Sequence, residues 1–193
     1  MHQALAKVRE LQEDRALTLV HPYDDPSIIA GQGTIGLEIL EDLPDVDAVI
    51  VPIGGGGLIA GIAAAVKLSK PDTRVIGVEP LGAPTLHRAL QHGAPVRLDT
   101  VDTIADGLTG PIAGTLTLAA VQRFVDEVVL VSDDEIAGAL RLMLERTKLL
   151  AEPAGAAATA ALLSSRVSLP AGATIVSLLS GGNIDHPRLK QLL

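Results

Sequence analysis

The chain has 193 residues, of which 48% are hydrophobic, and a formal net charge of −8 at pH 7. This length and apolar content allow one well-packed core and exclude intrinsic disorder. The acidic balance, with Tyr23 and Phe124 as the only aromatic residues, disfavours nucleic acid and anionic membranes as partners. The absence of cysteine excludes disulfides, iron–sulfur ligation and thiolate catalysis.

The amino-terminal part predicts a helix, a strand and a second helix. Residues 2–14 place apolar side chains three apart with charges between them, as in an amphipathic helix. This helix begins without a capping residue and without a signal-peptide pattern. Residues 17–20 are expected to form a short strand, and Asp25 or Ser27 to cap a helix that runs to about Asp42.

The rest of the chain alternates between short β-branched runs and helical patterns. The predicted elements are a strand at 46–51, a helix from the following glycines to Lys67, a strand at 74–79, a helix near 85–92, a turn-rich connection over 101–108, a helix near 115–124, a strand at 127–131, a helix opened by the capping box Ser132–Glu135 and running to about Leu149, a helix from Glu152-Pro153 through Leu163, and a strand at 174–179. Such alternation predicts an α/β fold, a parallel sheet with helices on both faces. No linker or repeat interrupts it, so residues 1–193 are expected to form one domain.

No apolar run reaches membrane-spanning length, and a cytoplasmic location is expected.

Four successive glycines, Gly54–Gly57, separate the strand at 46–51 from the helix behind it. Without Cβ atoms, the N–H groups of such a turn can approach an anion closely, and a helix start adds unpaired N–H groups. The pattern predicts a bound phosphate, with a flexible or merely tightly packed turn as the alternative. A phosphate-loop NTPase is excluded, because Leu58-Ile59-Ala60 follows the glycines instead of a lysine.

The segment Gly31–Gly36 matches the spacing of the dinucleotide-binding fingerprint. That fingerprint must directly follow a strand, whereas this segment lies about ten residues beyond Val20, inside a helical pattern. No acidic residue closes the next strand, which ends at Val51-Pro52. Close packing of this helix against a neighbour is therefore the preferred interpretation.

Several notable residues end or follow predicted strands. In a parallel sheet, ligands bind outside the carboxyl ends of the strands. Gly54–Gly57, Glu79 and Ser180–Gly182 all occupy such positions. We therefore expect them to lie at one edge of the sheet.

Seven segments together carry a resemblance to a known family. They are Pro26–Gly36, Val51–Gly61, Val78–Pro80, Thr103–Gly107, Glu145–Lys148, Glu152–Gly155 and Leu179–Asn183. In this order they resemble the carboxyl-terminal part of threonine dehydratases (threonine ammonia-lyases), in the fold-type-II pyridoxal-phosphate family that includes serine racemase. The resemblance covers nearly the whole chain and implies the large, tryptophan-synthase-β-like domain of these enzymes, incomplete at its amino end.

The resemblance implies pyridoxal 5′-phosphate as cofactor and assigns residues to it. The loop that holds the phosphate corresponds to Gly54, Gly55, Gly56, Gly57 and Leu58. Ser180 corresponds to the serine whose hydroxyl meets the pyridine nitrogen, and Gly107 and Glu152 correspond to residues that line the ring. Taken without the family, Ser180 could be an ordinary turn residue and Glu152 a first-turn helix acid.

A cation site is also implied for some family members. Glu79 and the carbonyl of Ala83 correspond to its ligands. Thr85 stands where serine racemase has a carboxylate, which weakens the case for a divalent cation. The alternative is that Glu79 is simply solvated at the end of its strand.

The family bonds its cofactor through a Schiff-base lysine in a Ser-x-Lys-x-Arg context of its amino-terminal part. The lysines of this chain, none in that context, are Lys7, Lys67, Lys70, Lys148 and Lys190. No catalytic residue is therefore assigned, and the chain is expected to be a carboxyl-terminal fragment without the small domain, inactive alone. Its exposed apolar surface should drive association, as a homo-oligomer or with the missing amino-terminal part.

The leading hypothesis is the cofactor-binding part of a pyridoxal-phosphate-dependent dehydratase. Its substrates would be L-threonine or L-serine, and its products a 2-oxo acid and ammonia. Serine racemase and hydroxyaspartate dehydratase are alternatives in the same family. A non-catalytic phosphate-binding or subunit-pairing module is the alternative of another class, and a nucleotide-binding Rossmann protein is less favoured.

Overall fold

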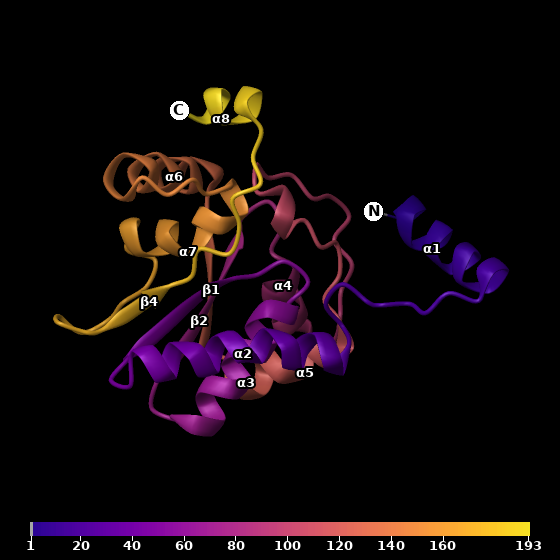
Figure 1. Cartoon of the computed structure of the whole chain (residues 1–193), viewed down its shortest axis with the longest axis horizontal. Helices are drawn as coiled ribbons and strands as arrows, with labels where there is room; N and C mark the ends of the chain where they lie inside the picture. Colours follow the sequence, from indigo (N-terminus) through magenta and orange to yellow (C-terminus); the bar gives the residue numbers. More distant parts are fainter. Residues whose placement is uncertain (1) are drawn as a thin grey trace.

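The computed structural model describes residues 2–193 and contains a four-stranded parallel sheet with the strand order β3-β2-β1-β4 (Figure 1). The strands are β1 (Ala48–Pro52), β2 (Arg74–Pro80), β3 (Glu127–Val131) and β4 (Ile175–Ser177). The parallel pairing confirms the predicted α/β class. All five residues of β1 are buried, as expected for an apolar strand at the centre of such a sheet.

Helices connect the strands and cover both faces of the sheet. They are α1 (His2–Arg15), α2 (Pro26–Asp42), α3 (Gly57–Ser69), α4 (Thr85–His92), α5 (Thr115–Phe124), α6 (Asp133–Thr147), α7 (Pro153–Leu163) and α8 (His186–Leu192), with a short 3₁₀ turn, η1 (Asp106–Leu108). Figure 1 shows α2, α3 and α5 on one side of the sheet and α6 and α7 on the other. No helix within residues 2–193 is both long and apolar enough to cross a lipid bilayer.

Successive side chains of the strands face two separate apolar layers. Val49 and Val51 of β1 pack into the layer that includes α3, α4 and α5. Ile50, between them, faces the layer formed by α6 and α7. This alternation is the strand period of two, and both sides are apolar because both faces are covered.

Glycines bring α2 and α3 into close contact. A Cβ at Gly36 would lie 2.9 Å from the carbonyl oxygen of Ile62, and one at Gly61 would lie 2.2 Å from that of Ile29. The backbones of the two helices therefore approach more closely than any larger residue allows. The segment Gly31–Gly36 is helical and packs against α3, which confirms its interpretation as a packing motif.

The predicted helix starts have the expected caps. The carboxylate of Asp25 accepts hydrogen bonds from the N–H groups of Ser27 and Ile28 at the start of α2. Ser132 and Glu135 form the predicted capping box at the start of α6. Each cap satisfies N–H groups that a helix cannot pair internally.

The predicted strand at 17–20 is wrong. These residues form no strand, and Val20 is 67% exposed. They run as an extended segment between α1 and the rest of the fold, away from the sheet (Figure 1). A strand needs a hydrogen-bonded neighbour, and β-propensity alone does not provide one.

Two carboxyl-terminal elements also differ from the prediction. The last strand is shorter than expected, since only Ile175–Ser177 pair with β1. The helix α8 was not predicted. The sequence pattern that could have predicted α8 spans only a few residues. Asp185 is the N-cap and accepts a hydrogen bond from the Arg188 N–H, and a proline occupies the first turn.

The contact between α2 and α3 gives a stability prediction. Gly61→Ala should lower the free energy of unfolding by about 1–3 kcal/mol, because the new methyl group overlaps the backbone of α2. Gly31→Ala is the matched control: Gly31 lies in α2 with open space around its Cβ position, so this variant should leave stability unchanged or raise it slightly. Urea unfolding of both variants measures the difference. Equal changes in the free energy of unfolding in the two variants would contradict the close packing of α2 on α3.

Candidate functional site

A cleft of about 1060 Å³ opens at the carboxyl edge of the sheet. Its lining includes every residue predicted to bind the cofactor: Gly54, Gly55, Gly56, Gly57, Leu58, Gly107, Glu152 and Ser180. These residues come from four separate segments of the chain, so the fold brings them together. Their role in binding stays a prediction.

The glycine turn joins the end of β1 to the start of α3 and lines the cleft. Gly56 is the N-cap of α3, with φ of +93°, and provides no side-chain cap. This positive φ is accessible to glycine at no steric cost. The first N–H groups of α3 have no partner within the helix, so the turn presents hydrogen-bond donors and the positive end of a dipole to an anion.

Tyr23 packs directly on the glycine turn. A Cβ at Gly55 would lie 2.3 Å from Cδ1 of the Tyr23 ring, so only glycine fits beneath it. The phenol donates a hydrogen bond to the carbonyl oxygen of Ile112 at 3.0 Å, and burial raises the pKa of Tyr23. The His21 ring meets the Tyr23 ring edge to face at 4.7 Å. Both residues line the cleft, and sequence reasoning assigned no role to either.

The Ser180 segment is fixed against the start of α7. The N–H group of Glu152 donates to the carbonyl oxygen of Gly181 at 3.0 Å. A Cβ at Gly155 would lie 2.2 Å from that same oxygen, so α7 and this loop are in close contact. Ser180 itself is exposed at the cleft, which leaves its hydroxyl accessible to a ligand.

Glu79 is fully buried at the end of β2 and is not among the described residues that line the cleft. Its carboxylate accepts hydrogen bonds from the N–H groups of Leu86 (2.7 Å) and His87 (2.8 Å), and so caps the start of α4. The carbonyl of Ala83 accepts the Thr85 N–H at 2.9 Å. Among the described residues, no group of three or more histidine, aspartate or glutamate side chains could hold a metal ion. The cation site at Glu79 and Ala83 stays a prediction.

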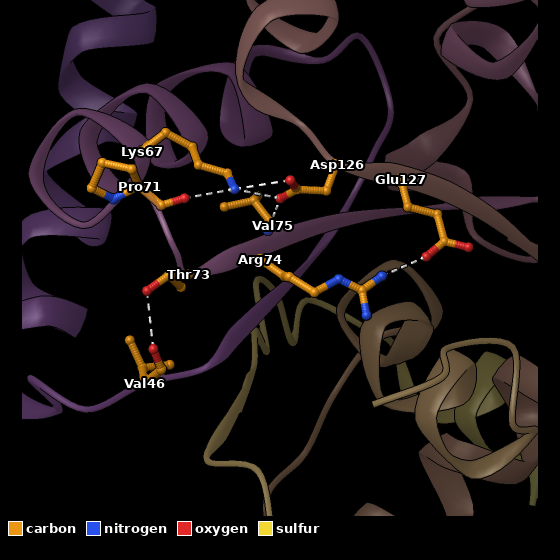
Figure 2. A network of polar contacts seen from close by, with 8 residues as sticks. All are labelled: Val46, Lys67, Pro71, Thr73, Arg74, Val75, Asp126 and Glu127. Atoms are coloured by element: carbon orange, nitrogen blue, oxygen red, sulfur yellow. Dashed lines mark hydrogen bonds and ion pairs between the residues drawn. The ribbon is translucent and has the colours of Figure 1, made fainter. Parts of the chain in front are cut away.

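The lysines of the chain do not line the cleft. Lys67 forms an ion pair with Asp126 at 2.8 Å, close to the amino ends of β2 and β3 (Figure 2). There Asp126 also accepts the Val75 N–H, and Arg74 pairs with Glu127 at 2.9 Å. This polar network holds the edge of the sheet opposite the cleft, where the strands begin.

Comparison with known proteins places these features in a family. The family described as pyridoxal-phosphate dependent enzyme matches residues 1–181. An L-threonine ammonia-lyase of Geobacter sulfurreducens is 52% identical over 183 residues, which cover 95% of this chain and 45% of that protein. A catabolic L-threonine dehydratase of Escherichia coli is 47% identical over 192 residues, which cover 99% of this chain and 58% of that protein. The chain thus spans about half the length of these curated relatives.

Solved structures show the same likeness in three dimensions. The processed form of threonine deaminase isoform 2 from Solanum lycopersicum has a TM-score of 0.88 and 40% identity, covering 95% of this chain and 54% of that one. Maize serine racemase has a TM-score of 0.88 and 38% identity, covering 95% of this chain and 56% of that one. The fold is therefore shared with both.

Burial of Glu79 predicts a pH dependence of stability. Burial raises the pKa of Glu79 to about 7, against the lowering effect of the hydrogen bonds from the α4 backbone. The folded state therefore holds this proton more tightly than the unfolded state, whose glutamate has its ordinary pKa of 4.5. Stability should fall as pH rises between these two values and level off above the higher one.

Glu79→Gln cannot titrate and should lack this decline. When the pH is raised from about 5 to about 8, the free energy of unfolding should decrease more in the unmodified chain than in the variant. The two decreases should differ by up to about 3 kcal/mol. Urea unfolding at the two pH values measures both losses. Parallel pH profiles would contradict the buried, proton-binding carboxyl.

Proposed function

Since the chain belongs to the family of pyridoxal-phosphate-dependent enzymes, we propose that it is the cofactor-binding part of an enzyme that eliminates water from L-threonine or L-serine. The products are a 2-oxo acid and ammonia. Relatives named L-threonine ammonia-lyase and L-threonine dehydratase support this substrate class. The observation that carries the proposal is the convergence of eight predicted residues on one cleft.

The glycine turn fits the phosphate of the cofactor. A Cβ at Gly54 would lie 3.2 Å from the carbonyl oxygen of Gly107, and one at Gly110 would lie 3.1 Å from the Gly55 nitrogen. Side chains at these positions would fill the space where the two segments approach each other. The backbone N–H groups of Gly54–Leu58 then bind the phosphate oxygens, as helix starts commonly do.

Ser180 and Glu152 orient the ring of the cofactor. A serine hydroxyl donates a hydrogen bond and keeps its proton, so Ser180 leaves the pyridine nitrogen neutral, whereas a carboxylate there would hold a proton on it. Glu152 and Gly107 also line the cleft, where they would limit the position of the ring. When bound, pyridoxal phosphate withdraws electrons from the substrate Cα and makes its proton acidic.

The base for this proton is proposed to lie outside the described residues that line the cleft. Of the described residues that line the cleft, none is a lysine, the residue that links this cofactor to its enzymes. We therefore propose that a second polypeptide segment supplies the lysine and the other wall of the cleft. Leu19 and Val20, exposed apolar residues at the cleft, fit such a contact.

Serine racemase activity is the second candidate, favoured by the structural likeness to maize serine racemase. A complementation experiment separates the candidates. The chain is mixed with the amino-terminal part of the Escherichia coli dehydratase and supplied with pyridoxal phosphate and L-threonine or L-serine. A 2-oxo acid and ammonia are the expected products, and D-serine would instead identify a racemase. Binding of cofactor without any product would favour a non-catalytic module.

The phosphate site predicts a specific loss of affinity. Gly56→Ala should raise the dissociation constant for pyridoxamine 5′-phosphate about tenfold, because alanine at a positive φ distorts the turn. Isothermal titration calorimetry measures the constant, and this probe has no aldehyde that reacts with lysines. Gly93→Ala is the matched control: Gly93 also has a positive φ (+75°) but ends α4 outside the cleft. The Gly93→Ala variant should bind pyridoxamine 5′-phosphate with unchanged affinity. An equal loss of affinity in both variants would contradict a phosphate site at the glycine turn.

A further inference from the structure

We propose that Thr117 is a positioning residue for the glycine turn. Through a hydrogen bond to the Gly55 carbonyl, it sets the direction in which the Gly56 N–H group points. The inference rests on the proposed function, because it concerns how the same turn holds the cofactor's phosphate. Thr117 lies in α5, more than sixty residues after the turn, and is not among the residues that line the cleft.

Thr117 is in direct contact with the turn. Its side chain is fully buried, and its Oγ1 donates a hydrogen bond to the Gly55 carbonyl oxygen at 3.0 Å. A Cβ at Gly56 would lie 3.0 Å from the Thr117 Cβ and 3.1 Å from its Oγ1. The threonine therefore supports two successive glycines from the side of α5.

The hydroxyl proton of Thr117 has two nearby acceptors. Gly55 O lies at 3.0 Å and Gly114 O at 3.2 Å. The Gly114 carbonyl already accepts the Leu118 N–H of α5 at 3.0 Å, and the Gly114 N–H donates to the same hydroxyl oxygen at 3.0 Å. A hydroxyl donates one hydrogen bond, so the shorter contact to Gly55 is the one that takes the proton.

Because the Gly55 carbonyl and the Gly56 N–H group belong to one peptide unit, the hydrogen bond from Thr117 also fixes the direction of that N–H group. All described peptide bonds are trans, and in a trans peptide the C=O and the N–H point in opposite directions. Because Gly55 O points to α5, the Gly56 N–H points away from α5. Gly56 lines the cleft, so this N–H is directed to the side where the phosphate is proposed to bind.

A peptide between two glycines needs such an anchor. Glycine populates positive and negative φ about equally, so the Gly55–Gly56 peptide can rotate with little steric resistance. A rotated peptide would present its carbonyl oxygen, and not its N–H, to the phosphate. Fixing the peptide beforehand removes this ordering cost from ligand binding.

The anchor is itself held in place. The carboxylate of Asp24 accepts the N–H groups of Thr115, Leu116 and Thr117 at 3.0, 2.9 and 3.1 Å, and so caps α5. The loop containing Asp24 also positions Tyr23 on Gly55. Thr117 therefore belongs to a rigid support behind the turn.

The test compares two ligands that differ only in the phosphate. Calorimetric titration of the 193-residue chain with pyridoxamine 5′-phosphate and with pyridoxamine gives a dissociation constant for each. Thr117→Val keeps the shape of the side chain and removes the hydroxyl. It should raise the constant for pyridoxamine 5′-phosphate about five- to tenfold and leave that for pyridoxamine unchanged. Thr117→Ser restores the hydroxyl and should bind the phosphate ligand nearly as tightly as the unmodified chain.

Two further variants make the result specific. Thr117→Ala and Thr117→Ser differ from each other only by the hydroxyl group. Their comparison tests the role of the hydroxyl even if Thr117→Val does not fold. Thr159→Val removes a hydroxyl that hydrogen-bonds Ser177 on the other face of the sheet, and should change neither constant.

The possible failures are distinguishable. If Thr117→Val and Thr117→Ala bind pyridoxamine 5′-phosphate as tightly as Thr117→Ser does, the role of Thr117 is wrong but the phosphate site stands. The same conclusion follows if loss of the hydroxyl weakens the binding of pyridoxamine 5′-phosphate and of pyridoxamine equally. An unmodified chain that binds pyridoxamine 5′-phosphate no better than pyridoxamine would overturn the proposed phosphate site, and the role of Thr117 with it.

Discussion

The unpaired N–H groups at the start of α3 are the feature on which the rest of the site depends. A side chain at the N-cap would satisfy one of them, but Gly56 has none. Strand β1 places this turn at the carboxyl edge of the sheet, where η1, α7 and the Ser180 segment surround the same cleft. Other helix starts differ. Glu79 caps α4 and Asp24 caps α5, whereas the N-cap residue of α7, Glu152, carries a negative charge but makes no side-chain cap hydrogen bond. These differences support our proposal that the phosphate binds at α3.

The two edges of the sheet have different roles. At the amino ends of the strands, Lys67, Asp126, Arg74 and Glu127 pair with one another and leave few groups for a ligand (Figure 2). At the carboxyl ends, glycines that approach neighbouring segments closely line the cleft instead. One edge stabilises the fold, and the other holds the cleft where we propose that the cofactor binds. The same division is expected wherever parallel strands end at a ligand site.

Sequence reasoning succeeded where the signal was local. The glycine turn, the Asp25 cap and the Ser132 capping box are each encoded within a few residues, and the structure has all three. It failed where the outcome depended on distant partners. Residues 17–20 have strand composition but no neighbouring strand. The contacts of Asp24 and Thr117 join segments about sixty to ninety residues apart, and nothing in a local pattern reports them. The assignment of Ser180 to a ring nitrogen came from the family resemblance, because a serine before glycines has no distinctive chemistry by itself.

We propose that the backbone N–H groups of the glycine turn bind the phosphate of the cofactor. Amide resonances of the ¹⁵N-labelled chain, followed during titration with pyridoxamine 5′-phosphate, test it most directly. We predict saturable shifts at Gly54–Leu58, with the same titration of pyridoxamine leaving these amides unmoved. Shifts confined to other parts of the chain, such as the glycines of α2 at 31–36 or the strand starts near Arg74, would contradict the account.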